Sequence, residues 1–200
     1  FMVLANVAAA EELERLRRPL LYRVHEEPTA EKLDALREVA NIGCGHAVNA
    51  LARLVGGRTV NLSVPRAVLA AAAEVAELLG GGEAPVVAAK LGMEGQLRGV
   101  LLLVLPREDS AALESLLLRR QDAPAEERES ALSEAANIVA SACLSAIGTL
   151  TGWRLLPTVP ELVRGTAGLV VSRAVAEAQG GDRMVVLETR FSAVGAPAVS

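Results

Sequence analysis

The apolar residues of the first half of the chain follow first a helical and then an extended periodicity. From residue 29 to residue 54, apolar side chains recur at spacings of three, four and eight positions, which predicts a long helix with one buried stripe. Thr29 stands at the position of an N-cap, and Gly56-Gly57 marks the end of the helix. The chain therefore opens its regular structure with an amphipathic helix.

Shorter elements follow this helix. Residues 58–65 alternate in polarity and predict a strand that ends at Pro65, and the alanine-rich residues 66–79 predict a helix closed by three glycines. Two further strands are expected at 84–93 and 95–106, with their turn at Glu94-Gly95, and then a helix at 108–118. A charged connector leads from this helix into the second half.

The second half repeats this order less regularly. It predicts a long helix over about 125–150, a strand at 154–160 that Pro157 interrupts, and a strand at 182–194. Residues 161–181 fit either a helix or a strand. The strand 99–106 has no good counterpart near the C-terminus, so either the final strand is short or the chain stops before it.

The two halves are copies of one unit. Residues 31–58 and 127–154 align without a gap at an offset of 96 residues, and eleven of the 28 aligned positions are identical. Two copies are too few for a solenoid, so they predict one domain with internal pseudo-twofold symmetry. We expect an α+β fold, with a largely antiparallel sheet and the two long helices packed together on one face.

Composition narrows the possible classes of protein. Hydrophobic residues make up 52% and charged residues 22% of the 200 positions, which excludes a mainly disordered chain. A net charge of −4 and only four aromatic residues argue against binding to nucleic acid. Cys44 and Cys143 are too few for a disulfide framework, lack metal-ligand spacing, and are expected to be small buried residues of a protein in a reducing cytosol.

Residues 135–153 carry no charge, which raises the question of a membrane span. The stretch also contains one asparagine, two serines, two threonines and two glycines. This is too polar for a helix surrounded by hydrocarbon, so we expect a half-buried helix of a soluble protein and no membrane insertion.

Both long helices carry the same polar pattern. Asp34, Glu38 and Asn41 lie at positions i, i+4 and i+7, so their side chains fall within about 60° of one helix face. The second copy repeats this spacing with Ser130, Glu134 and Asn137. Each asparagine is followed by a proline, Pro65 after 23 intervening residues and Pro160 after 22.

The pattern [DS]-x3-E-x2-N-x22-P, present twice, resembles the CheC family of chemotaxis phosphatases, a group that includes CheX and FliY. The resemblance covers residues 30 to about 192 and is nearest to the two-copy CheC members. It implies a single domain over 29–200, with repeats at about 29–120 and 125–200, and leaves residues 1–28 as an extension outside it. The first copy departs from the family spacing by one residue between its asparagine and its proline.

The resemblance implies a specific activity. Members of this family hydrolyse the aspartyl phosphate of a CheY-type response regulator in chemotaxis signalling. By this resemblance Glu38 and Glu134 would anchor the regulator, Asn41 and Asn137 would position the attacking water, and Asp34 and Ser130 would assist docking. The chain itself would bind no cofactor, because the regulator carries its own Mg²⁺. A CheD-type deamidase is a possible second partner.

The residue types suit this chemistry. An acyl phosphate is already activated, so a correctly placed water supplies most of what hydrolysis requires. A carboxamide both donates and accepts hydrogen bonds, and can therefore hold a water in line without changing its charge. A glutamate one helical turn earlier can pair with a basic group of the partner and set the docking register.

Two other interpretations stay open. Glutamate and asparagine on a helix commonly form nothing more than its solvated face, and a duplication copies surface residues as well as sites. The chain could also be a non-catalytic CheC-like module that binds a CheD-type deamidase or flagellar switch components. A small-molecule enzyme has little support, because the sequence shows no nucleophile–base pair, metal cluster or cofactor loop.

Overall fold

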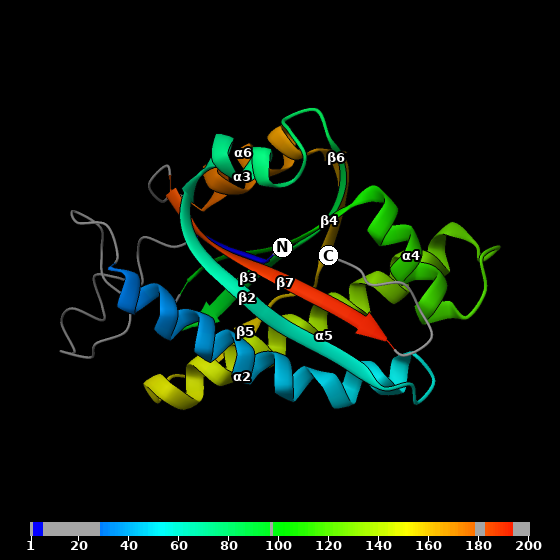
Figure 1. Ribbon diagram of the computed structural model, residues 1–200, viewed down its shortest axis with the longest axis horizontal. Coiled ribbons are helices and arrows are strands. Elements are labelled where there is room, and N and C mark those ends of the chain that lie inside the picture. Colours follow the sequence, from blue (N-terminus) through cyan, green and yellow to red (C-terminus); the bar gives the residue numbers. More distant parts are fainter. Residues whose placement is uncertain (1, 6–28, 97, 179–182, 194–200) are drawn as a thin grey trace.

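A computed structural model describes residues 2–5, 29–96, 98–178 and 183–193 of the chain. A twisted antiparallel sheet lies between two layers of helices, with the two long helices on one side of it (Figure 1). The helices are α2 (Ala30–Leu54), α3 (Ala72–Leu78), α4 (Arg107–Leu118), α5 (Ala125–Thr151) and α6 (Ala167–Glu177). The strands are β1 (Met2–Ala5), β2 (Val60–Ala71), β3 (Pro85–Gly95), β4 (Gly99–Pro106), β5 (Leu155–Pro157), β6 (Glu161–Thr166) and β7 (Arg183–Ala193).

The two halves of the chain exchange strands across the sheet. Its order is β2-β7-β1-β4-β3-β5, with β6 also paired to β3, and every pairing is antiparallel. The outer strand β2 of the first copy therefore pairs with β7 of the second, and the outer strands β5 and β6 of the second copy pair with β3 of the first. This arrangement gives the sheet a pseudo-twofold axis between β1 and β4, and the expected α+β duplication is confirmed.

The strand missing from the second copy comes from the N-terminus. β1 pairs with β4 on one side and with β7 on the other, so it occupies the position in the second half that β4 occupies in the first. Neither a short final strand nor an early stop is needed to explain the repeat. The strand could not be predicted from the sequence, because four apolar residues are too few to show a measurable periodicity.

Alternating side chains of the strands fill two separate cores. On one face of the sheet, Ala70, Val86, Ala88, Leu102, Val104, Met184 and Val186 pack against α3 and α6. On the other face, Val64, Ala89, Leu91, Leu101 and Leu187 pack against α2 and α5. The two long helices thus share one face, as expected, and the shorter pair of helices covers the opposite face.

α2 and α5 pack antiparallel and cross closely at Gly43. Val39 in the first half of α2 packs with Leu144 near the end of α5, whereas Leu51 near the end of α2 packs with Ala135 in the first half of α5. At the crossing, a Cβ atom added to Gly43 would lie 2.9 Å from the Cα of Cys143. The glycine is therefore required for the helices to approach this closely.

The structure corrects the prediction for residues 66–71. They continue β2 to Ala71 and pair with β7, so the alanine-rich helix α3 is only seven residues long. The local helix preference of alanine is overridden because the extended conformation pairs this segment with a neighbouring strand. The ambiguous residues 161–177 divide into strand β6 and helix α6.

The helix α5 is long and apolar enough to pass a length-and-hydropathy test for a membrane span. Half of the residues in its most apolar window are buried within the fold. They include Ala136 and Ala140, which pack between the sheet and α2. The apolar character of α5 is thus accounted for by its place in the core of a folded domain.

Candidate functional site

The structure leaves both polar stripes at the surface of their helices. Asp34 and Glu38 on α2 are exposed, and so are Ser130 and Glu134 on α5. Neither Glu38 nor Glu134 has an ion pair or hydrogen bond among the described residues, whereas Asp34 pairs with Arg37 at 3.8 Å on the same helix. Each helix therefore presents an unpaired carboxylate to solvent one turn before its asparagine.

The two asparagines are both half-buried but make different contacts. The Asn41 side chain donates from Nδ2 to the carbonyl oxygen of Val64 at 3.1 Å and accepts from the Val64 backbone N–H at Oδ1 at 2.8 Å. The described residues offer no hydrogen bond to the Asn137 side chain. The Asn41 side chain is thus occupied by hydrogen bonds to the backbone of Val64, whereas the Asn137 side chain is available to bind another molecule.

The strand β2 explains why Asn41 is committed. Between the pairs Ser63–Arg190 and Arg66–Glu188, two residues of β2 face a single residue of β7, which defines a β-bulge at Val64 and Pro65. A bulged residue loses its ladder partners, and Val64 is only 2% exposed, so water cannot replace them. The carboxamide of Asn41 supplies both missing partners, and Pro65 has no N–H to satisfy.

In the second copy, the segment that precedes the motif proline satisfies its backbone hydrogen bonds in a different way. Residues 158–160, which include Pro160, separate β5 from β6 and lie opposite two residues of β3. Thr158 pairs with Gly92 through its backbone N–H and its side-chain hydroxyl, and Val159 is 87% exposed. Because its backbone is open to water, Val159 does not need a carboxamide, and Asn137 remains available.

This contrast predicts different stability losses for the same substitution. Asn41→Ala leaves the buried N–H of Val64 without a partner and should lower the free energy of unfolding by about 1–3 kcal/mol. Asn137→Ala removes no hydrogen bond among the described residues and should change it by about 0.5 kcal/mol or less. Urea unfolding of both variants measures the difference, and equal losses would contradict the assignment.

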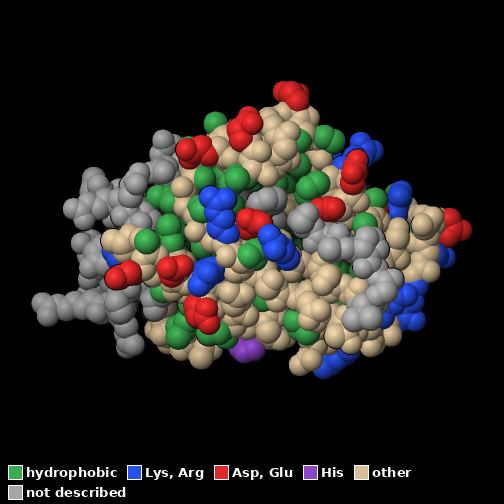
Figure 2. Space-filling view, viewed as in Figure 1, with side chains coloured by type: hydrophobic (Ala, Val, Ile, Leu, Met, Phe, Trp, Pro, Cys, Tyr) green, Lys and Arg blue, Asp and Glu red, His purple; other side chains and the backbone are tan. Residues whose placement is uncertain are grey.

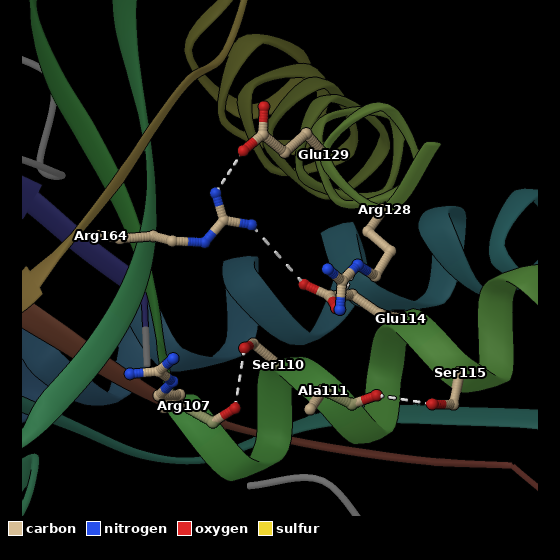
Figure 3. A network of polar contacts seen from close by, with 8 residues as sticks. All are labelled: Arg107, Ser110, Ala111, Glu114, Ser115, Arg128, Glu129 and Arg164. Atoms are coloured by element: carbon tan, nitrogen blue, oxygen red, sulfur yellow. Dashed lines mark hydrogen bonds and ion pairs between the residues drawn. The ribbon is translucent and has the colours of Figure 1, made fainter. Parts of the chain in front are cut away.

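A cluster of charged side chains around the buried Glu114 connects the first turns of α5 with α4 and β6 (Figure 3). Glu114 of α4 is 8% exposed and lies 3.9 Å from both Arg128 of α5 and Arg164 of β6. Arg164 also pairs with Glu129, the residue before Ser130. Since these contacts join α4, α5 and β6, they hold the start of the second stripe in a defined position. Sequence reasoning missed this cluster because its members are distant along the chain.

A cavity of about 100 Å³ lies inside the domain, and its lining includes Ala135 and Ala136, the two residues between Glu134 and Asn137. It is bounded by the sheet, α2, α4 and α5, and its lining side chains are apolar apart from Thr189. None of the six stripe residues lines it. The described residues also contain no group of three or more His, Cys, Asp or Glu side chains that could hold a metal ion.

Comparisons with known proteins place the matched segments on these same helices. Residues 31–69 and 127–164 match the sequence model of the CheC-like family. The CheY-P phosphatase CheC of Bacillus subtilis (strain 168) is 35% identical over 166 residues, which cover 80% of this chain and 79% of that protein. Both matched segments include the complete stripe of their copy.

Solved structures show the same fold. The crystal structure of Thermotoga maritima FliY superimposes with a TM-score of 0.71 at 19% identity and covers 86% of this chain and 88% of that one. A chain of the crystal structure of the FliM–SpeE complex from H. pylori gives a TM-score of 0.60 at 12% identity, with coverage of 86% of this chain and 87% of that one. At these identities the likeness establishes the architecture of the chain alone.

Proposed function

The chain belongs to the CheC-like family, and from this premise we propose that it is a phosphatase that hydrolyses the aspartyl phosphate of a CheY-type response regulator. The observation that carries the proposal is the carboxamide of Asn137, which a rigid helix holds one turn after the carboxylate of Glu134, both without a partner among the described residues. The similarity to the CheY-P phosphatase CheC of Bacillus subtilis supports the same class of substrate.

In the proposed reaction this chain acts on a water molecule. The regulator brings the aspartyl phosphate and its Mg²⁺ as parts of the substrate. The carbonyl oxygen of the Asn137 side chain accepts a hydrogen bond from the water and aims it at phosphorus, opposite the aspartyl oxygen. The water attacks, the bond between phosphorus and the aspartyl oxygen breaks, and aspartate and inorganic phosphate result. Because the asparagine takes up no proton, it is ready for another turnover without regeneration.

The two copies are proposed to contribute unequally. Before Asn41 can hold a water, its carboxamide must leave Val64, and the buried N–H of Val64 then loses its partner. That loss costs about 1–3 kcal/mol, which lowers the share of competent first sites about 5- to 150-fold. The second copy carries no such cost, so Asn137 is expected to provide most of the activity.

Glu134 is proposed to anchor the regulator through a basic group of that partner. On the face shown in Figure 2, acidic and basic side chains are interspersed and no field of one sign covers the surface. Glu134→Gln should raise KM about ten- to a hundredfold while kcat stays within a factor of two, because a charge-assisted hydrogen bond contributes about 1.5–3 kcal/mol.

A matched control comes from the other side of the sheet. Glu77 on α3 is exposed, and Glu77→Gln changes the net charge by the same amount on the opposite face. Its KM should equal that of the parent chain. If both variants raise KM equally, the effect reflects overall charge, and the assignment of Glu134 as an anchor is wrong.

The alternative is a binding module without catalysis. It is supported by the structural use that the first copy makes of Asn41, since a motif asparagine evidently can serve the fold alone. The proposal is tested by following phosphate loss from a phosphorylated cognate regulator with the chain present at one tenth of the regulator concentration. Faster loss over many turnovers supports the phosphatase. Unchanged loss together with co-elution of the two proteins on a sizing column would support the binding module.

A further inference from the structure

The two cysteines of the chain meet where the two site-bearing helices cross. Cys44 of α2 and Cys143 of α5 are 1% and 2% exposed and belong to one packed core cluster. Gly43, the residue before Cys44, packs directly on the backbone of Cys143, so the two cysteines lie side by side at this crossing. We propose that Cys44 and Cys143 form a reversible disulfide with a peroxide oxidant, and that this bond lowers the activity of both sites. The second part rests on the proposed phosphatase function.

At the crossing α2 and α5 are already in contact through their backbones, so the two helices cannot approach each other more closely. A Cβ on Gly43 would meet three backbone atoms of α5: the Cα of Cys143 at 2.9 Å, its nitrogen at 3.2 Å and the oxygen of Ala142 at 3.2 Å. A disulfide requires a sulfur–sulfur distance of about 2.05 Å, much shorter than any contact between two thiols. The two sulfur atoms must therefore move toward each other, and we expect one helix to turn against the other as they do.

The pKa values of the two thiols shift in opposite directions, which suits one as the nucleophile and the other as the resolving thiol. The hydrogen bond from Cys143 lowers the pKa of Cys44, despite burial. The same hydrogen bond and burial raise the pKa of Cys143 well above its ordinary value. Cys44 is thus the better thiolate and the expected nucleophile, and Cys143 remains protonated until it resolves the intermediate.

The chemistry balances with hydrogen peroxide as the oxidant. The sulfur of Cys44 attacks one peroxide oxygen, the O–O bond breaks, and the departing hydroxide takes up the Cys44 proton to become water. The sulfur of Cys143 then attacks the sulfenic acid of Cys44, the S–O bond breaks, and the released hydroxide leaves as a second water with the Cys143 proton. Two thiols lose two electrons and one peroxide becomes two waters.

Rotation at the crossing would reach the sites directly. Asn41 lies three residues before Cys44, and Asn137 lies six residues before Cys143 on the same rigid helices. A displacement of about 1 Å at a water-positioning group can reduce a rate a hundredfold. We therefore expect the oxidised chain to accelerate regulator dephosphorylation about tenfold less than the reduced chain, with recovery after treatment with a dithiol.

The test separates the bond from its consequence. The folded chain is treated with hydrogen peroxide, remaining thiols are alkylated under denaturing conditions, and intact mass is measured with and without prior reduction. The prediction is a product lighter by two hydrogen atoms that resists alkylation until reduced, with an intrachain peptide linking Cys44 to Cys143. Because both thiols are buried, a bulky aromatic disulfide reagent should not label the folded chain.

Control variants fix the interpretation. Cys143→Ala prevents the bond, and its phosphatase activity should no longer respond reversibly to peroxide. Two free alkylated cysteines after treatment, or higher sulfur oxides in place of the bond, would overturn the modification site. A disulfide that forms without changing activity would overturn the regulatory part alone. If the reduced chain has no activity at all, the proposed function fails, while the mass measurement still decides the modification site.

Discussion

Asn137→Ala is expected to remove most of the phosphatase activity, lowering kcat/KM about sixfold or more, while Asn41→Ala removes less than half of it. The reason is the different commitment of the two carboxamides: Asn41 holds both backbone groups of Val64, and Asn137 is free among the described residues. Losing one preorganised hydrogen-bonding group that acts in the transition state commonly reduces a rate about 10²–10³-fold, and the first site limits the net loss here.

The measurement is the rate of phosphate loss from one regulator preparation with each variant at the same concentration. Circular dichroism confirms that both variants are folded under the assay conditions. The pair also serves as its own control, since the expected order for activity is the reverse of the expected order for stability. A larger activity loss for Asn41→Ala would show that the contact with Val64 does not restrain the first site.

Gly43→Ala is expected to destabilise the domain by about 2 kcal/mol, whereas the same change at Gly45 stabilises it by about 0.5–1 kcal/mol. At Gly43 the three atoms nearest to the added methyl are backbone atoms of α5, the closest at 2.9 Å, so a whole helix must shift. At Gly45, two residues further along the same helix, the methyl meets nothing within 4 Å. Alanine there only restricts the unfolded chain and favours the helix.

Thermal unfolding distinguishes the predicted destabilisation by Gly43→Ala from the predicted stabilisation by Gly45→Ala. For a domain of this size 1 kcal/mol corresponds to about 2–4 °C, so the midpoint should fall for Gly43→Ala and rise for Gly45→Ala. Helix α2 holds both positions, and therefore a general effect of alanine on its helicity would move both midpoints upward. Such an upward shift at Gly43 would contradict the close crossing on which the relative placement of the two sites depends.

Long periodic segments made most of the fold predictable. The patterns over α2 and α5 extend for about seven turns each, and the glycines after α2 end it where expected, with Gly56 and Gly57 in the left-handed region. The helix predicted for residues 66–71 was wrong, because these residues pair with β7, which is distant in the sequence, and no local pattern contains that information. The four residues of β1 went unrecognised because so short an apolar segment carries no measurable periodicity.

The candidate site was predictable in its chemistry but not in its asymmetry. The spacing of Glu38 and Asn41, repeated in the second copy, correctly indicated that both stripes face the surface. It could not show that Asn41 bonds to Val64, because that contact depends on a β-bulge between strands from different copies. The catalytic roles of these residues remain predictions. The repeat made the two sites look equivalent, and only their surroundings in the fold distinguish them.

The most direct test of the central claim compares the parent chain with the double variant Asn41→Ala/Asn137→Ala. Phosphate loss is followed from a phosphorylated CheY-type regulator, and sedimentation or sizing confirms that both chains still bind it. The account predicts that the parent accelerates the loss and that the folded, binding-competent double variant leaves it at the spontaneous rate. Acceleration that survives in the double variant would contradict water positioning by the two asparagines.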